Sequence, residues 1–189
     1  MIETLKIIHA LHYLLKKIGK ADKLKLLKLL FLADKYHLIK YGRTVTGDEY
    51  WAMEYGPVGS VAKDILSFDP NFNSYELKMA KRFIQKEGEN DFKPSENIKI
   101  EDLDYLSETD KEALDFIVDH FGGKPTFDLV NFTHKYPEWK KYEEDFKEGF
   151  TKREKIKLVD MISTIEEDPF DFSEEHIQET KDMILGFFD

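Results

Sequence analysis

The chain has 189 residues, is 41% hydrophobic and 14% aromatic, and contains no cysteine. A chain of this size and composition can bury one core, which argues against disorder and favours one domain with an extension. The absence of thiols excludes a disulfide framework, thiolate zinc sites and cysteine nucleophiles, and a reducing, cytoplasmic setting is the simplest expectation. Lys6, His9 and His12 interrupt the apolar N-terminal run, so we expect neither a signal peptide nor a membrane-spanning helix.

Charge is distributed unevenly along the chain. The net charge of −10 argues against nucleic acid as a partner. Residues 1–47 hold ten lysines or arginines and three acidic residues, whereas residues 158–189 hold one lysine and ten acidic residues. These opposite local charges are compatible with two solvated faces. They are also compatible with a basic face that binds either the acidic tail or an acidic partner.

Two helices are predicted at the start of the chain. The first ends at Gly19 and has one apolar stripe that includes a histidine: Leu5, Ile8, His12, Leu15 and Ile18. The second runs from an N-cap at Asp22 to about Tyr41, and its wide apolar arc predicts a central position, with Lys25, Lys28 and Lys35 facing water. Asp34 lies within this arc, where an ionised carboxylate needs hydrogen-bond donors, so we expect a cap, a turn or a cation beside it.

Glycine turns punctuate the middle of the chain. The stretch "YWAMEYGPV" (Tyr50–Val58) predicts a short strand over residues 50–55, a turn at Gly56 and a helix from Pro57 to about residue 66. Residues 69–99 fit a helix followed by a small β-hairpin near residues 82–94 that turns at Gly88. The expected fold is mainly α with a minor β component, a compact helical domain around the helix at residues 22–41.

Capping signals predict the later helices. Ser107 with Asp110 begins a helix that ends at Gly122, a helix over residues 126–135 follows, and Pro137 begins another. Thr151 and Glu154 form a predicted capping box before a helix that carries Ile156, Val159 and Ile162. After a linker-like stretch at residues 166–173, Ser173 is the predicted cap of a last helix carrying Ile177, Ile184 and Phe187.

The sequence contains no recognisable catalytic constellation. His9 and His12 lie three residues apart, but no H-E-x-x-H spacing is present, and we expect no metal. "GPVGS" (Gly56–Ser60) lacks the lysine of a P-loop and the third glycine of a dinucleotide fingerprint. No G-x-S-x-G nucleophile motif occurs. We therefore expect no cofactor and no enzymatic activity.

Three segments resemble, in order and spacing, a known family. They are "KLLKLLFLADKYHLIKYGRTVTGDEYWAMEYGPV" (Lys25–Val58), "LSETDKEALDFIVDHFGG" (Leu106–Gly123) and "FTHKYPEW" (Phe132–Trp139). The family is the SocA-like or Panacea domain, also described as the GepA-type phage-associated domain. The resemblance covers residues 3–145, and we expect a domain at 1–145 with an acidic helical extension at 146–189 packed on it.

The resemblance implies an antitoxin. Proteins of this family are mainly helical, are often encoded beside small toxins and neutralise them by direct binding, while the namesake is an adaptor that delivers its toxin to a ClpXP-type AAA+ protease. A cognate protein toxin is thus the expected partner, and proteolytic delivery of a toxin or another client is the alternative. An enzyme that uses histidines and carboxylates is a second alternative. The toxin's identity, transcriptional repression and the oligomeric state stay open.

The aromatic stretch at Tyr50–Val58 is the predicted partner site. Ala52, Met53, Phe31 and Leu38 are expected in the core, because side chains of a strand alternate between its two faces. Aromatic side chains that stay exposed beside a rigid turn supply large contact area to a partner. The candidate partner-binding residues are Tyr41, Tyr50, Trp51, Tyr55, Gly56, Pro57, His134 and Trp139. The alternative is that each of these residues supports the fold.

The acidic tail is expected to lie against the basic N-terminal half and to stabilise it. Apolar positions such as Ile156 and Ile184 need a surface to cover them. Two alternatives are that the tail itself contacts the toxin or that it marks the protein for a protease.

Overall fold

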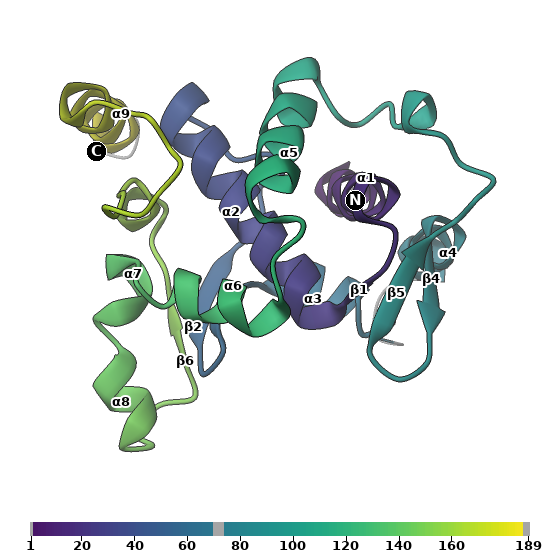
Figure 1. Ribbon diagram of the computed structural model, residues 1–189, viewed down its shortest axis with the longest axis horizontal. Coiled ribbons are helices and arrows are strands. Elements are labelled where there is room, and N and C mark those ends of the chain that lie inside the picture. The colour runs from purple at the N-terminus through teal and green to yellow at the C-terminus, as the bar shows by residue number, and fades with distance from the viewer. Residues whose placement is uncertain (1, 70–73, 187–189) are drawn as a thin grey trace.

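One long helix, α2 (Lys23–Tyr41), lies at the centre of the computed structural model, which describes residues 2–69 and 74–186 (Figure 1). Its N-terminus is capped as predicted, because the Asp22 carboxylate accepts a hydrogen bond from the backbone N–H of Lys25 at 2.9 Å. The helix ends at Gly42, whose φ of 72° is the left-handed conformation common at helix ends. Every residue from Leu26 to Ile39 is buried, which confirms the central position.

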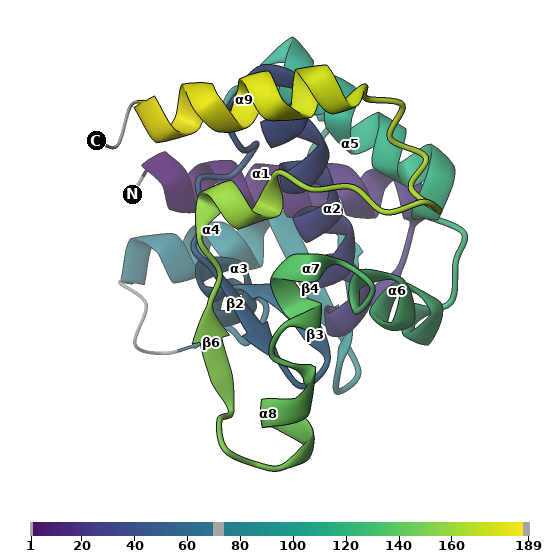
Figure 2. The same cartoon turned by 90° about the vertical axis from the view of Figure 1, so that its left-hand side faces the viewer.

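Longer helices pack around α2 (Figures 1 and 2). α5 (Glu108–Phe121) and α1 (Ile2–Ile18) lie beside it, and α9 (Glu174–Gly186) crosses its C-terminal half. Shorter described helices are α3 (Ser60–Ile65), α4 (Ser74–Phe83), α6 (Thr126–Thr133), α7 (Pro137–Lys140) and α8 (Glu143–Lys147), with 3₁₀ turns η1 (Ile100–Asp102) and η2 (Leu158–Met161). The described chain is thus mostly helical, as predicted.

The described residues form two small antiparallel sheets, and the first has the strand order β1-β5-β4. Its strands are β1 (Ala21–Asp22), β5 (Asp91–Pro94) and β4 (Ile84–Glu87). β4 follows directly on α4 and pairs with β5 through a turn at Gly88, whose φ is 72°. The predicted helix followed by a hairpin is therefore confirmed, because glycine adopts the left-handed conformation of the turn at little steric cost.

The second sheet contains the predicted aromatic strand and has the order β3-β2-β6. Its strands are β2 (Tyr50–Met53), β3 (Gly56–Gly59) and β6 (Arg153–Lys155). The helix predicted to begin at Pro57 is wrong, since Pro57 lies in β3 opposite Ala52, and α3 begins only at Ser60. The Asp48 carboxylate accepts hydrogen bonds from the first free N–H groups of α3, at Val61 and Ala62. A cap from outside the local sequence thus sets the start of α3.

The capping box predicted at Thr151 and Glu154 is also wrong. Arg153–Lys155 is the edge strand β6, and Lys155 pairs with Trp51 of β2. The Thr151 hydroxyl donates to the carbonyl oxygen of Arg153 at 3.0 Å instead of capping a helix. Backbone pairing with a strand more than ninety residues away therefore overrides the local helix signal.

Two lysines predicted to face water are buried. Lys28 and Lys35, both on α2, have no exposed surface. The Lys35 Nζ donates to Glu138 Oε1 at 2.7 Å, to the Met161 carbonyl oxygen at 2.8 Å and to Ser163 Oγ at 2.9 Å. Lys35 thus joins α2 to α7 and to the segment around η2. A buried ammonium is tolerated here because a carboxylate and two further oxygens replace its hydration.

Asp34 receives the donors that its position demands. The backbone N–H of Thr46 donates to it at 2.9 Å, the Tyr50 hydroxyl donates at 2.8 Å, and the Thr46 hydroxyl donates as well. The turn expected beside this carboxylate is therefore confirmed. Burial raises the pKa of Asp34 to about 6 even though these hydrogen bonds favour the charged form.

The last helix contacts the C-terminal end of α2. Ser173 caps α9 as predicted, since its hydroxyl accepts from the backbone N–H of His176 at 3.2 Å. The Ile39 carbonyl oxygen, in the last turn of α2, is 2.8 Å from His176 Nε2 and accepts a bond from the Thr180 hydroxyl at 3.1 Å. The predicted apolar position Phe187 lies outside the described residues, and the division at residue 145 stays a prediction.

Candidate partner-binding groove

The structure separates the predicted partner-site residues into buried and exposed ones. Tyr50 and Trp139 are each only 3% exposed, and Gly56 and Pro57 are buried. The Tyr50 ring packs edge-to-face on Phe31, and its hydroxyl bonds Asp34, so it belongs to the core. Ala52 and Met53 of this strand are both predicted in the core, but only Ala52 is buried, and Met53 is half-buried on the opposite face. Because side chains alternate along a strand, Tyr50 and Ala52 lie on one face and Trp51 and Met53 on the other.

Tyr55 is the most exposed of these aromatic residues. It is 50% exposed at the β2–β3 turn. Trp51 of β2 is half-buried, and the Arg153 guanidinium lies 4.8 Å from its ring centroid. Tyr41 is 37% exposed, but it ends α2, so about 25 Å of helix separates it from the start of α2. The structure thus does not bring Tyr41 to the hairpin, and Tyr55 and Trp51 remain as the accessible aromatics there.

Two buried side chains donate hydrogen bonds that hold the β2–β3 turn from its protein-facing side. The Lys28 Nζ donates to the Pro57 carbonyl oxygen at 2.7 Å, and the Trp139 Nε1 donates to the Met53 carbonyl oxygen at 2.7 Å. Gly56, between them, has a φ of 97°, and a Cβ there would lie 2.9 Å from both Lys28 Nζ and Thr133 Oγ1. Only glycine fits this turn, because both its backbone conformation and its close approach exclude a side chain.

Lys28 is an unusual residue to support a turn. Its side chain is fully buried, and no carboxylate of the described residues lies within ion-pair distance of it. Burial lowers the pKa of Lys28 from 10.5 to about 7. One hydrogen bond to a backbone carbonyl offsets only part of the cost of desolvating an ammonium. The role of Lys28 is therefore to position the turn and not to stabilise the fold.

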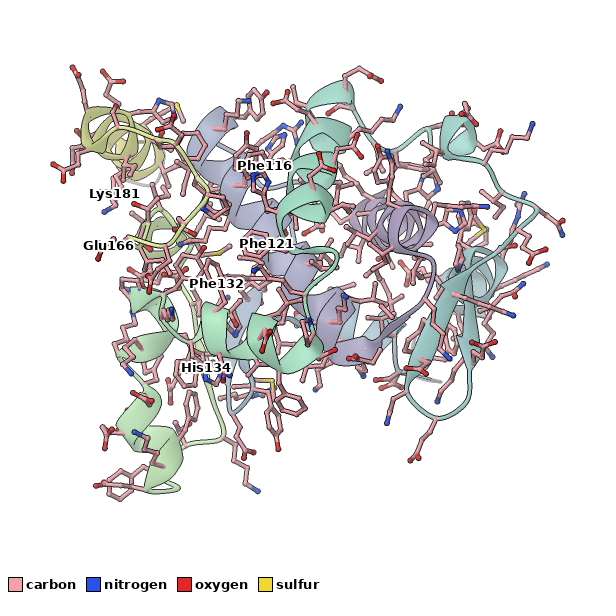
Figure 3. All side chains as sticks on the ribbon, viewed as in Figure 1. Phe116, Phe121, Phe132, His134, Glu166 and Lys181 are labelled. Carbon is pink, nitrogen blue, oxygen red and sulfur yellow. The ribbon has the colours of Figure 1, made fainter. Side chains whose placement is uncertain are left out.

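His134 completes the support beneath the turn. It lies at the C-terminal end of α6 (Figure 3) and stacks on Trp139 with ring centroids 3.5 Å apart and planes 2° from parallel. Burial, and then the charge of Lys28, lower the pKa of His134 to about 4, so the ring is neutral at pH 7. Trp139 in turn stacks on Phe146 of α8, at 5.9 Å between centroids. Of the predicted site residues, His134, Trp139, Gly56 and Pro57 thus do meet, as the support of the turn.

A groove of about 1160 Å³ opens beside this supported turn. We call it the hairpin groove. Its walls are the start of α2, the β2–β3 turn, α3, the β4–β5 turn, the start of α6 and the α8–β6 loop. Its main apolar lining residues are Leu24, Leu27, Met53, Tyr55, Val58, Phe127 and Phe146. Phe127 is 63% exposed. The sequence indicates Tyr55 but not the groove, because the walls come from six separated segments.

The remaining candidate chemistry is structural in the described residues. His12 Nδ1 lies 2.7 Å from the Phe83 carbonyl oxygen, and His9 stacks against Phe83 and Tyr105. Within residues 2–69 and 74–186, no three histidines or carboxylates gather as metal ligands would, and no helix is long and apolar enough to cross a membrane. The hairpin groove is therefore the feature that carries a functional hypothesis.

Comparison with known proteins adds one finding. Residues 26–140 match the family model described as antitoxin SocA-like, Panacea domain. The match begins in α2 and ends with α7, so it contains the β2–β3 hairpin and its buried support, while the α8–β6 wall of the groove lies beyond it. No curated protein and no solved structure matches the chain.

Proposed function

The chain belongs to the SocA-like, Panacea-domain antitoxin family, and on this premise we propose that it binds a cognate protein toxin and neutralises it by direct contact. The contact surface in this proposal is the hairpin groove with its exposed rim. Neutralisation then needs no catalysis by this chain, and the complex forms in the cytoplasm. The observation that carries the proposal is the position of the groove, which borders the β2–β3 hairpin within the segment that matches the family model.

The construction of the hairpin supports this role. Two buried hydrogen bonds fix the turn that carries Tyr55, so a partner that binds there meets a preorganised surface. Exposed Tyr55 and Phe127 supply rigid aromatic contact area next to an apolar floor. An apolar floor bordered by exposed aromatic side chains suits recognition of another protein.

Coexpression tests the proposal. The gene next to this one in its genome is expressed in a heterologous host with and without the antitoxin candidate, and growth is measured. We expect the neighbour to arrest growth and the wild-type chain to restore it, whereas Tyr55→Ala combined with Phe127→Ala restores it poorly. The control is Tyr105→Ala, which removes a 40% exposed tyrosine outside the groove. Failure of the wild-type chain to rescue any neighbouring gene product would refute the proposed function.

The alternative is an adaptor that delivers the toxin to a ClpXP-type protease. Both roles require binding, so the rescue is repeated in a host without that protease while toxin levels are followed by immunoblot. Under direct neutralisation, rescue persists and the toxin accumulates in a bound form. Rescue that disappears with the protease, together with a stable toxin, would assign the adaptor role instead.

A further inference from the structure

The hairpin groove combines an apolar floor with exposed aromatic rims. Leu27 and Val58 at its floor are only 4% and 6% exposed, while Tyr55 and Phe127 on its rims are 50% and 63% exposed. Large rings that stay exposed around a concave apolar surface are the usual mark of a binding site for another chain. The shape alone, however, does not specify the charge of that chain.

Lysines line the groove, although the whole chain is acidic. Lys23, Lys63 and Lys152 all belong to its lining, and no carboxylate of the described residues lies within ion-pair distance of any of them. The Lys23 ammonium donates to the Ser67 hydroxyl, and its pKa is lowered by burial and then by the charge of Lys63, while the charge of Asp64 acts in the opposite direction. Lysines and arginines outside the groove differ, since Lys6 and Arg43, for example, both form ion pairs with Asp110.

The acidic residues of the lining do not cancel this charge. Asp22 accepts hydrogen bonds from the backbone N–H of Lys25 and from the Thr126 hydroxyl, so both of its carboxylate oxygens are already engaged. Glu54 lies on the exposed turn, so the lining holds three lysines against two carboxylates and keeps a net positive charge. Unpaired cations around an apolar floor attract a partner whose own charges are negative.

We infer that the occupant of the hairpin groove is a segment of the partner protein whose apolar side chains are flanked by aspartate or glutamate. The apolar side chains bury against Leu27, Met53 and Val58, and the flanking carboxylates pair with Lys63 of α3 and Lys152 of the α8–β6 loop. This inference rests on the proposed function, because it assumes that the partner is a protein toxin. It adds the chemistry of the segment that the chain recognises.

A random peptide library displayed on phage tests the inference with the full-length chain. We expect enrichment of peptides that combine large apolar residues with aspartate or glutamate. The double variant Lys63→Glu, Lys152→Glu should reduce binding of a selected peptide at least about tenfold, since like charges then face each other. Lys78→Glu is the matched control, because Lys78 is exposed and lies outside the groove. A single-stranded DNA pool of mixed sequence is tested in parallel as a competing polyanion.

Each contrary outcome overturns the inference. Enriched peptides without acidic residues, no enrichment, equal loss with Lys78→Glu, or tighter binding of the DNA pool would each contradict it. Growth rescue separates this result from the proposed function. If the double variant loses the peptides but still rescues as well as the wild type, the toxin binds elsewhere and only the inference about the groove fails.

Discussion

The ammonium of Lys28 donates a hydrogen bond to the carbonyl oxygen of Pro57, 2.7 Å away, from a position with no exposed surface. This contact joins the central helix to the turn that borders the hairpin groove. Because Lys28 has no carboxylate partner among the described residues, its charge destabilises the fold while its length and donor group position the turn. The contact also makes stability depend on pH in a direction that can be measured.

The first prediction concerns this pH dependence. The pKa of Lys28 is about 7 in the folded chain and 10.5 ordinarily, so between these values the unfolded chain binds the extra proton. The contribution of Lys28 to the free energy of unfolding therefore rises with pH from 7 to 10, by at most about 1.4 kcal/mol per pH unit. Lys28→Met removes this contribution. Urea unfolding across that range should show the wild type gaining stability relative to Lys28→Met.

The control for this prediction is Lys25→Met, one turn earlier on the same helix and half-exposed. The wild type should gain little relative to this control variant over the same pH range. Parallel pH profiles for the wild type and Lys28→Met would contradict the account, because they would mean that Lys28 titrates as it does in water.

The start and end signals of helices and turns could be predicted from the sequence, whereas the burial of Lys28 was not predicted. The Asp22 cap, the end of the first helix at Gly19, the Gly88 turn and the Ser107–Asp110 capping box were all predicted correctly, because neighbours in the sequence determine them. The burial of Lys28 does have a signal in the sequence. Apolar residues lie on every side of it from Leu26 to Leu32, and a helix that is apolar all round buries its lysines too.

Other features had no local signal. Pro57 enters a strand because it pairs with Ala52 and because Asp48 caps α3 three residues later. Thr151 begins an edge strand because β2 lies beside it. The hairpin groove forms where six separated segments meet, and the sequence predicts only Tyr55 on its rim.

The second prediction concerns Gly56. Gly56→Ala should destabilise the chain more than Gly88→Ala, although both glycines have positive φ. A Cβ at Gly88 meets nothing within 4 Å, so its cost is backbone strain alone, about 1–2 kcal/mol. A Cβ at Gly56 adds contact with Lys28 Nζ and Thr133 Oγ1 at 2.9 Å. Urea unfolding of both variants measures the difference, and equal losses would mean that the turn is not closely supported.

The third prediction concerns the buried pair Lys35–Glu138. Glu138→Gln should lower the free energy of unfolding by about 3 kcal/mol, because it leaves an ammonium buried without a countercharge. Lys35→Met with Glu138→Leu removes both charges and should recover much of this loss. The control is Lys135→Met, which breaks an exposed ion pair with Glu167 and should cost under about 1 kcal/mol. Equal losses for Glu138→Gln and Lys135→Met would show that the buried pair contributes little.

The fourth prediction concerns the acidic tail. Truncation after Phe150 removes β6, the Met161 and Ser163 oxygens that bind Lys35, and the Thr180 bond to Ile39. We expect a clearly lower melting temperature by circular dichroism, because Lys35 and one edge of β2 lose their partners. An unchanged melting temperature would contradict a stabilising tail. Unchanged stability with lost growth rescue would instead assign the tail to toxin binding.

The most direct test of the account is the affinity of the purified chain for its toxin, measured by isothermal titration calorimetry. Tyr55→Ala with Phe127→Ala should weaken binding at least about 30-fold, corresponding to about 2 kcal/mol, since the two rings are the exposed anchors of the hairpin groove. Tyr105→Ala should leave the Kd unchanged. A toxin that binds the groove variant within about threefold of the wild type would contradict the claim that this chain recognises its partner through the hairpin groove.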